Sequence, residues 1–234
     1  MAIPSTAIAE LMGSAGFDCV VVDLEHSTLS ISEAGELIRV IDLAGGSPLV
    51  RLSSNDSVEI KRVLDAGAEG IVVPMVTTPE HVLAAADGMF YPPKGKRGVG
   101  LGRAQAYGRG FEHYFKAKSS NLTLIIQIEH VDALANLDQI FGSGLVDGYI
   151  VGPYDLSCSL GLPGQFDSSE MLGALSEIKS CAEHYGIPGG LHVIEPEVAS
   201  LKAGYEEGYR IMIYSVDFRI IEKDISRALR KLRG

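Results

Sequence analysis

The chain has 234 residues, of which 46% are apolar. This composition excludes a disordered or fibrous protein and predicts one globular domain over 1–234. The 30 acidic residues outnumber the 20 basic ones and give a formal net charge of −10. Such a surface repels phosphate backbones and anionic lipids, so we expect no nucleic-acid partner and no membrane partner. The three cysteines are widely spaced, which predicts reduced thiols. The first residues lack a signal-peptide pattern, and together these features predict a cytoplasmic protein.

Short apolar runs alternate with segments of helical period along the chain, a pattern that predicts a parallel sheet with helices outside it. Strands are expected at 19–22, 47–50, 71–73, 122–126, 146–151, 190–193 and 211–213. Helices are expected at about 5–14, 31–44, 56–67, 79–87, 131–141, 168–185, 195–206 and 218–233. Because no nucleotide-binding fingerprint follows the first strand, the pattern favours a (β/α)8 TIM barrel over an open doubly wound sheet. Too few residues precede the first helix for a normal strand, so we expect the first barrel strand to be short or missing.

Most of the charge near the expected strands stands at their carboxyl ends, where parallel barrels place their active sites. The residues concerned are Asp23, Glu25 and His26 after the first run, Arg51 after the second, Gln127, Glu129 and His130 after the fourth, and Asp155 after the fifth. A barrel that served only as a scaffold would not need this concentration at one rim. The sequence therefore predicts an active site there.

Glu129 and Asp155 follow neighbouring expected strands, so their carboxylates can converge above the barrel. Two carboxylates without His or Cys partners suit a hard divalent cation such as Mg²⁺ or Mn²⁺, with water and substrate oxygens as further ligands. The alternative is that the two carboxylates are unrelated, or that Asp155 caps a helix.

His26 and Arg51 carry the other chemistry expected at this rim. A rim histidine is a natural general base, although a lone histidine is more often structural. Arg51 has a permanent charge suited to a substrate carboxylate or a developing oxyanion. Its alternative role is an ion pair with Asp23 or Glu25, and the two roles are compatible.

The segment 91–100, YPPKGKRGVG, lies in the longest gap between expected strands. It follows a Pro-Pro turn and does not link a strand directly to a helix, so a nucleotide-binding loop is disfavoured. We expect a rim or lid element that helps to enclose an anionic substrate, the alternatives being a surface excursion or a subunit contact.

Taken together, these motifs resemble those of the HpcH/HpaI aldolases, metal-dependent class II pyruvate aldolases that act on 4-hydroxy-2-oxo acids. The matching blocks are GFDCVVVDLEH (16–26), PLVRLSSNDSVEIKRVLDAGAEGIVVPMV (48–76), YPPKGKRGVG (91–100), IIQIE (125–129) and DGYIVGPYDLS (147–157). They occur in order and span most of the chain. Family members usually carry a further strand ahead of the segment that matches IPSTAIAE, which fits the short or missing first strand expected above.

The resemblance implies a role for each matching residue. It makes His26 the base, Arg51 the group that holds the keto acid and stabilises the enolate, and Asp65 a support for the basicity of His26. It places the metal ion on Glu129 and Asp155, with Mg²⁺ or Mn²⁺ expected and Co²⁺ or Zn²⁺ also compatible. Gln127 and Tyr154 would line the substrate pocket, together with Asp155 and Arg51. Because family members commonly have alanine where Tyr154 stands, the space for the aldehyde half is expected to differ.

The implied reaction is reversible cleavage of a 4-hydroxy-2-oxo acid to pyruvate and an aldehyde. The resemblance also implies a homo-oligomer, a hexamer built as a trimer of dimers with a barrel helix exchanged between partners. Alternatives on the same barrel are a citrate-lyase or malyl-CoA-lyase type enzyme, an oxaloacetate decarboxylase, or a degenerate barrel that binds metal without turnover.

Overall fold

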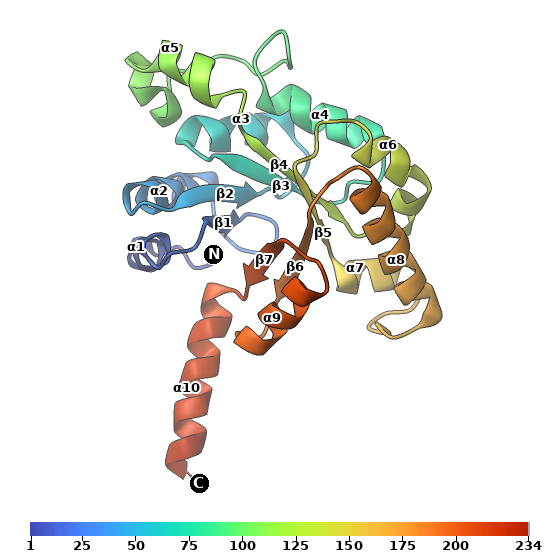
Figure 1. Ribbon diagram of the computed structural model, residues 1–234. Helices are drawn as coiled ribbons and strands as arrows, with labels where there is room; N and C mark the ends of the chain where they lie inside the picture. The colour runs from blue at the N-terminus through green and yellow to red at the C-terminus, as the bar shows by residue number, and fades with distance from the viewer. Residues whose placement is uncertain (234) are drawn as a thin grey trace.

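The computed structural model describes residues 1–233, which form one curled parallel sheet with helices on its outer side (Figure 1). The sheet contains seven strands whose spatial order is their chain order. They are β1 (Cys19–Asp23), β2 (Ser47–Arg51), β3 (Gly70–Val73), β4 (Thr123–Ile128), β5 (Gly148–Val151), β6 (Gly189–Val193) and β7 (Ile211–Tyr214). Every strand predicted from the apolar runs is present, with ends shifted by at most two residues.

The helices lie between successive strands, except α1, which precedes β1, and α10, which follows β7. They are α1 (Thr6–Ser14), α2 (Ile31–Leu43), α3 (Ser57–Ala66), α4 (Pro79–Met89), α5 (Phe111–His113), α6 (Leu137–Phe141), α7 (Pro153–Ser159), α8 (Ser169–His184), α9 (Val198–Glu206) and α10 (Asp217–Arg233). Side-chain caps set several starts: Ser30 and Glu33 form a capping box on α2, and Asp56 accepts two backbone N–H bonds at the start of α3.

The expected (β/α)8 architecture is present as a curled parallel sheet of seven strands, but it is not a closed eight-stranded barrel, because the sheet of residues 1–233 stays open between β1 and β7. A single residue stands in place of the expected first strand. The Met1 ammonium group donates to the Val21 carbonyl at 2.5 Å, and the Asp23 N–H donates to the Met1 carbonyl at 2.9 Å. Residues 1–5, which lie ahead of α1, contain no strand.

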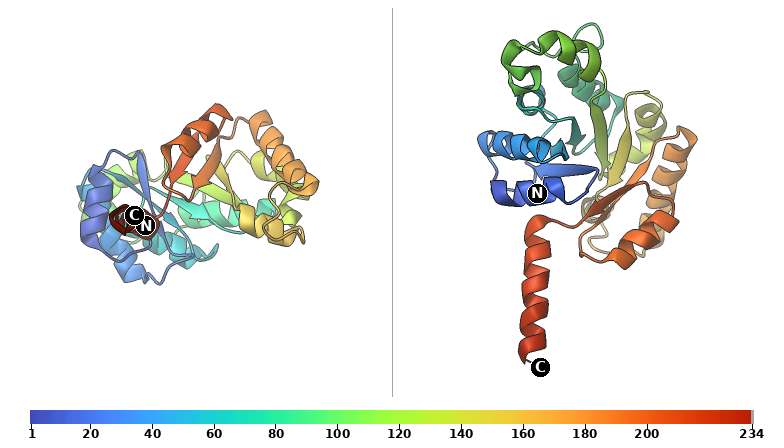
Figure 2. Two further views of the ribbon diagram at one scale, coloured as in Figure 1. Left: turned by 90° about the horizontal axis from the view of Figure 1, so that it is seen from below. Right: turned by 60° about the vertical axis from the view of Figure 1, so that its left-hand side comes forward.

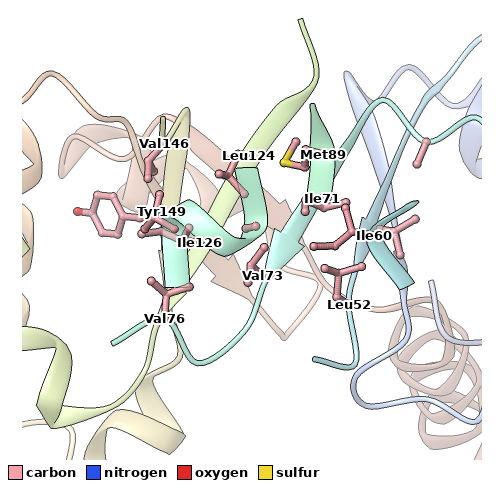
Figure 3. Packing of buried hydrophobic residues seen from close by; sticks show 14 of the residues in the cluster. Leu52, Ile60, Ile71, Val73, Val76, Met89, Leu124, Ile126, Val146 and Tyr149 are labelled. Atoms are coloured by element: carbon pink, nitrogen blue, oxygen red, sulfur yellow. The ribbon is translucent and has the colours of Figure 1, made fainter. Parts of the chain in front are cut away.

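Two apolar clusters stabilise the sheet, one on each of its faces. The larger fills the space between the sheet and the helices; Figure 3 shows part of it, including Leu52, Ile60, Ile71, Met89 and Leu124. The smaller lies inside the curl and consists of Leu49, Val72, Ile125 and Ile150, with Cys19, Val21, Ile211 and Ile213 packed against them. A strand side chain that lies on the same face of the sheet as this second cluster therefore points into the barrel.

The final helix, α10, stands away from the rest of the molecule (Figures 1 and 2). Phe218, Ile221, Ile225, Leu229 and Leu232 form an exposed apolar stripe along it at the spacing of one helix face. Among residues 1–233, no helix has both the length and the apolar character required to cross a bilayer.

Candidate active site

Glu129 and Asp155 face the same small space at the carboxyl edge of the sheet. Glu129 directly follows β4, and Asp155 lies in the first turn of α7, which follows β5. These strands are neighbours in parallel register, with Ile128 opposite Val151. A Cβ atom built on Gly152 would lie 2.7 Å from Oε2 of Glu129 and 3.5 Å from Oδ2 of Asp155. The glycine therefore keeps open a space that both carboxylates border.

The Glu129 carboxylate is almost fully buried and held through both oxygens. Its Oε1 accepts the Met75 backbone N–H at 2.7 Å, and its Oε2 accepts Nε2 of Gln127 at 2.6 Å. Met75 adopts a left-handed conformation, with φ of 53°. That conformation is costly for a residue with a side chain and is often found at functional sites. Sequence reasoning placed Met75 after the third strand but gave it no role, because the interaction uses only its backbone.

This donor set fits a hard divalent cation. Carboxylate oxygens are ligands that Mg²⁺ and Mn²⁺ prefer, and such ions commonly retain positions for water and substrate. Across residues 1–233 no group of three or more His, Cys, Asp or Glu side chains is arranged to hold a metal ion. Two protein carboxylates would thus leave most positions of a bound ion to water and substrate oxygens.

Arg51 is fixed by a two-point ion pair with Asp23. These residues end β2 and β1 and lie opposite one another in the sheet. Burial alone would raise the pKa of Asp23, but the hydrogen bonds and the charge of Arg51 hold that pKa below its usual value. The Arg51 Nη1 atom also lies 3.2 Å from Oε2 of Glu25. Burial and the nearby charge of Glu129 raise the pKa of Glu25 against the opposing effect of Arg51.

The His26 imidazole stands at the mouth of the barrel, where 65% of its side chain is exposed. Its backbone N–H donates to Oδ1 of Asp23 at 3.3 Å, and the Glu25 N–H donates to the same oxygen at 3.0 Å. The turn after β1 is therefore built on the aspartate that holds Arg51. The closest charged group to the imidazole is Glu25, with Nε2 and Oε2 3.8 Å apart.

Tyr154 precedes Asp155 in α7, and its ring packs edge-on against Phe166 at 4.8 Å between centroids. Its ring remains largely exposed. The structure thus brings His26, Arg51, Gln127, Glu129, Tyr154 and Asp155 to one edge of the sheet.

Asp65 does not join this group within the chain. It lies in the last turn of α3, which has returned to the opposite, amino-terminal edge of the sheet. Its Oδ1 accepts Nη2 of Arg97 at 2.6 Å and Nε2 of Gln105 at 3.3 Å. The helix expected at 56–67 already indicated this position, because a helix between two parallel strands returns the chain to the amino-terminal edge of the sheet. The partners Arg97 and Gln105 could not be read from the spacing.

The segment 91–100 is not a lid over the barrel mouth, so that expectation is wrong. The Arg97 side chain is buried on Asp65, and Lys96 pairs with Asp87. Lys94 lines a pocket with Thr123 and Asp147, which stand at the amino-terminal edge of the sheet. The basic residues of this segment bind the protein itself. The chain between Arg103 and Lys118 then forms three short helical turns that the sequence pattern did not predict.

Three comparisons with known proteins match nearly the whole chain to aldolases or to a family of aldolases and lyases. A family model described as HpcH/HpaI aldolase/citrate lyase matches residues 2–219. A hydroxypyruvate/pyruvate aldolase of Sagittula stellata is 36% identical, covering 93% of this chain and 85% of that protein. A 2-dehydro-3,6-dideoxy-6-sulfogluconate aldolase of Pseudomonas putida is 32% identical, and the match covers 98% of this chain and 89% of that protein. The crystal structure of an HpcH/HpaI aldolase/citrate lyase family protein from Burkholderia cenocepacia superposes with a TM-score of 0.93 at 27% sequence identity. The superposition covers 100% of this chain and 93% of that protein's chain.

Proposed function

This chain belongs to the HpcH/HpaI aldolase/citrate lyase family, and from that premise we propose that it is a divalent-metal-dependent pyruvate aldolase. It cleaves a 4-hydroxy-2-oxo acid reversibly to pyruvate and an aldehyde. The observation that carries the proposal is the pair of carboxylates, Glu129 and Asp155, that border one open space beside the fixed Arg51. The names of the relatives, hydroxypyruvate/pyruvate aldolase and sulfogluconate aldolase, support it.

Glu129 and Asp155 would hold the ion, and Mg²⁺ or Mn²⁺ suits their oxygens best. When bound, such an ion acts as a Lewis acid that draws electron density from a 2-oxo acid. The Met75 N–H and the Gln127 amide keep the Glu129 carboxylate in place for this task. Gln127, Tyr154 and Asp155 border the keto-acid pocket.

His26 accepts the proton of the 4-hydroxyl group as the C4–O bond becomes a carbonyl. The C3–C4 bond breaks and its electron pair passes to the pyruvate half, which leaves as the enolate. The permanently charged Arg51, oriented by Asp23, stabilises the negative charge that develops on that half. Protonation at C3 then gives pyruvate. Among residues 1–233 no lysine directly follows a strand, so the site offers no amine for a Schiff base at the rim.

The test is pyruvate release from 4-hydroxy-2-oxo acids, measured with Mn²⁺ or Mg²⁺ and again with excess chelator. We expect release that requires metal, falls at least a hundredfold in His26→Ala and is unchanged in the His184→Ala control, whose histidine lies at the end of α8. Failure to release pyruvate from any such acid, with metal bound, would refute the aldolase.

The protein also acts as a homo-oligomer in this proposal, a hexamer built as a trimer of dimers. The exposed apolar stripe of α10 supports a contact with a second copy, because a monomer would leave these side chains in water. Within one chain Asp65 and His26 lie at opposite edges of the sheet, so Asp65 would support His26 from a neighbouring subunit. Light scattering on the Ile221→Lys, Ile225→Lys double variant should show a smaller mass, whereas Arg230→Ala should not.

A further inference from the structure

His192 is an inward-facing histidine for which the proposed reaction has no role. It lies on β6 opposite Ile213 of β7, and Ile213 packs against the cluster inside the barrel. Paired residues of parallel strands share a face, so His192 also points into the barrel. His192 is the last residue but one of β6, and its Nε2 lies 3.1 Å from the carbonyl oxygen of Ser215, the residue after β7. The imidazole therefore lies at the carboxyl edge of the sheet, the edge at which Asp23 and Arg51 end β1 and β2.

One ring nitrogen of His192 forms a hydrogen bond, and the partner in that bond shows which nitrogen carries the proton. Nε2 lies 3.1 Å from the carbonyl oxygen of Ser215. A carbonyl only accepts hydrogen bonds, so Nε2 carries the proton. Ser215 is itself held by a bond from its N–H to the Val193 carbonyl and one from its Oγ to the Ile194 carbonyl. The imidazole is therefore oriented by a turn that is itself held by hydrogen bonds.

The other nitrogen, Nδ1, is free to bind something else. No residue within 1–233 forms a hydrogen bond to it, and it is not among the buried atoms that lack a partner, so solvent reaches it. Burial lowers the pKa of His192, which keeps the ring neutral at pH 7. A neutral ring with a proton on Nε2 presents Nδ1 as an acceptor, and its natural partner is a hydroxyl group.

The charges around the mouth favour an uncharged ligand. No lysine or arginine occurs between Val131 and Ile178, the stretch that contains β5 and the loop after it. At the ends of β6 and β7, Arg219 and Lys223 pair with Glu195. Arg51 already pairs with Asp23 and Glu25. The buried Met1 ammonium group, whose charge also acts on His192, donates to the Val21 carbonyl and is balanced by the nearby charges of Asp217 and Asp23. An aldehyde with a carboxylate would find no unpaired cation among these groups.

We propose that His192 is a specificity-determining residue that accepts a hydrogen bond from a hydroxyl group on the aldehyde half, so that the enzyme favours uncharged 2-hydroxyaldehydes. In the cleavage direction the corresponding substrates are 4,5-dihydroxy-2-oxo acids. This inference rests on the proposed aldolase activity and adds the class of its aldehyde. His192 takes part in no bond making or breaking; it positions the hydroxyl next to the reacting carbon.

The experiment measures kcat/KM for aldol addition of pyruvate, with Mn²⁺, to three aldehydes: glycolaldehyde, acetaldehyde and succinic semialdehyde. In the unmodified protein we expect glycolaldehyde to exceed acetaldehyde by about tenfold, the usual value of one hydrogen bond to a neutral group. Succinic semialdehyde should be the poorest of the three. In His192→Leu the preference for glycolaldehyde should disappear, through KM for the aldehyde, while KM for pyruvate and the rate with acetaldehyde stay unchanged.

The His192→Asn variant is the matched control, because its amide oxygen can replace Nδ1 as an acceptor and should restore part of the preference. Thermal melting of both variants checks that they fold. An unchanged glycolaldehyde preference in His192→Leu would overturn the proposal. An equal loss with all aldehydes would also overturn it, because His192 would then act in the common chemical step. If the unmodified protein adds pyruvate to no aldehyde, the proposed function itself fails.

Discussion

Arg51 and Asp23 form a two-point ion pair in which Nε donates to Oδ1 at 2.8 Å and Nη2 donates to Oδ2 at 2.6 Å. The pair joins the carboxyl ends of two adjacent strands, and the same Oδ1 accepts the backbone N–H groups of the turn that carries His26. One aspartate therefore orients both the cation and the base of the proposed site. Bidentate pairs of this kind are stronger and more directional than single contacts.

Asp23→Asn should destabilise the fold because it leaves the half-buried Arg51 charge without its main partner. Since both side chains retain some contact with water, we expect a loss of about 2 kcal/mol, less than for a fully buried pair. Urea unfolding measures it. Glu36→Gln, which removes the partner of Arg39 on the exposed face of α2, should change stability by less than about 0.5 kcal/mol. Equal effects of the two substitutions would contradict the structural role of Asp23.

The contribution of Asp23 should depend on pH in a defined direction. Its pKa is lower in the folded protein than in the unfolded chain, so the stabilisation is fully present above the ordinary aspartate value of about 3.9. It is lost as the pH falls through the lowered folded value. The stability difference between the unmodified protein and Asp23→Asn should accordingly be constant from pH 7 to about pH 5 and shrink in stronger acid. A difference that stayed constant down to pH 3 would count against this assignment.

Gly152→Ala should close the space between the two proposed metal ligands. The new Cβ would lie 2.7 Å from Oε2 and 2.9 Å from Cβ of Glu129, closer than folded proteins allow. We expect Mn²⁺ affinity, measured by titration calorimetry, to fall at least tenfold because the Glu129 carboxylate must move. Gly173→Ala in α8 meets nothing within 4 Å. It should keep the affinity and stabilise the helix by up to about 1 kcal/mol. Full affinity in Gly152→Ala would place the ion elsewhere.

Arg97→Ala should be far more harmful than Lys96→Ala, although both residues belong to the same basic segment. The Arg97 side chain is completely buried and binds Asp65 and the Tyr114 hydroxyl, whereas the Lys96 side chain is 81% exposed. Removal of one partner from a buried pair costs about 3 kcal/mol or more, and an exposed pair contributes less than about 1 kcal/mol. Chemical unfolding of the two variants makes the comparison. Similar midpoints would show that the segment is a surface excursion after all.

The sequence by itself determined the parallel sheet and its seven strands, because buried strands need continuous apolar runs that are visible without a structure. It also determined that Arg51, Glu129 and Asp155 gather at one edge, since the carboxyl ends of parallel strands always meet there. Only the tertiary structure decided that the Met1 backbone pairs with β1 at the open edge of the sheet, because pairing between backbone groups leaves no mark on side-chain composition. Only the structure decided that Asp65 binds Arg97 and that Met75 and Gly152 shape the place of Glu129. Met75 acts through its backbone N–H and Gly152 through its lack of a side chain, so neither role can be recognised from residue type. The pairing of Asp65 with Arg97 depends on how distant segments pack together.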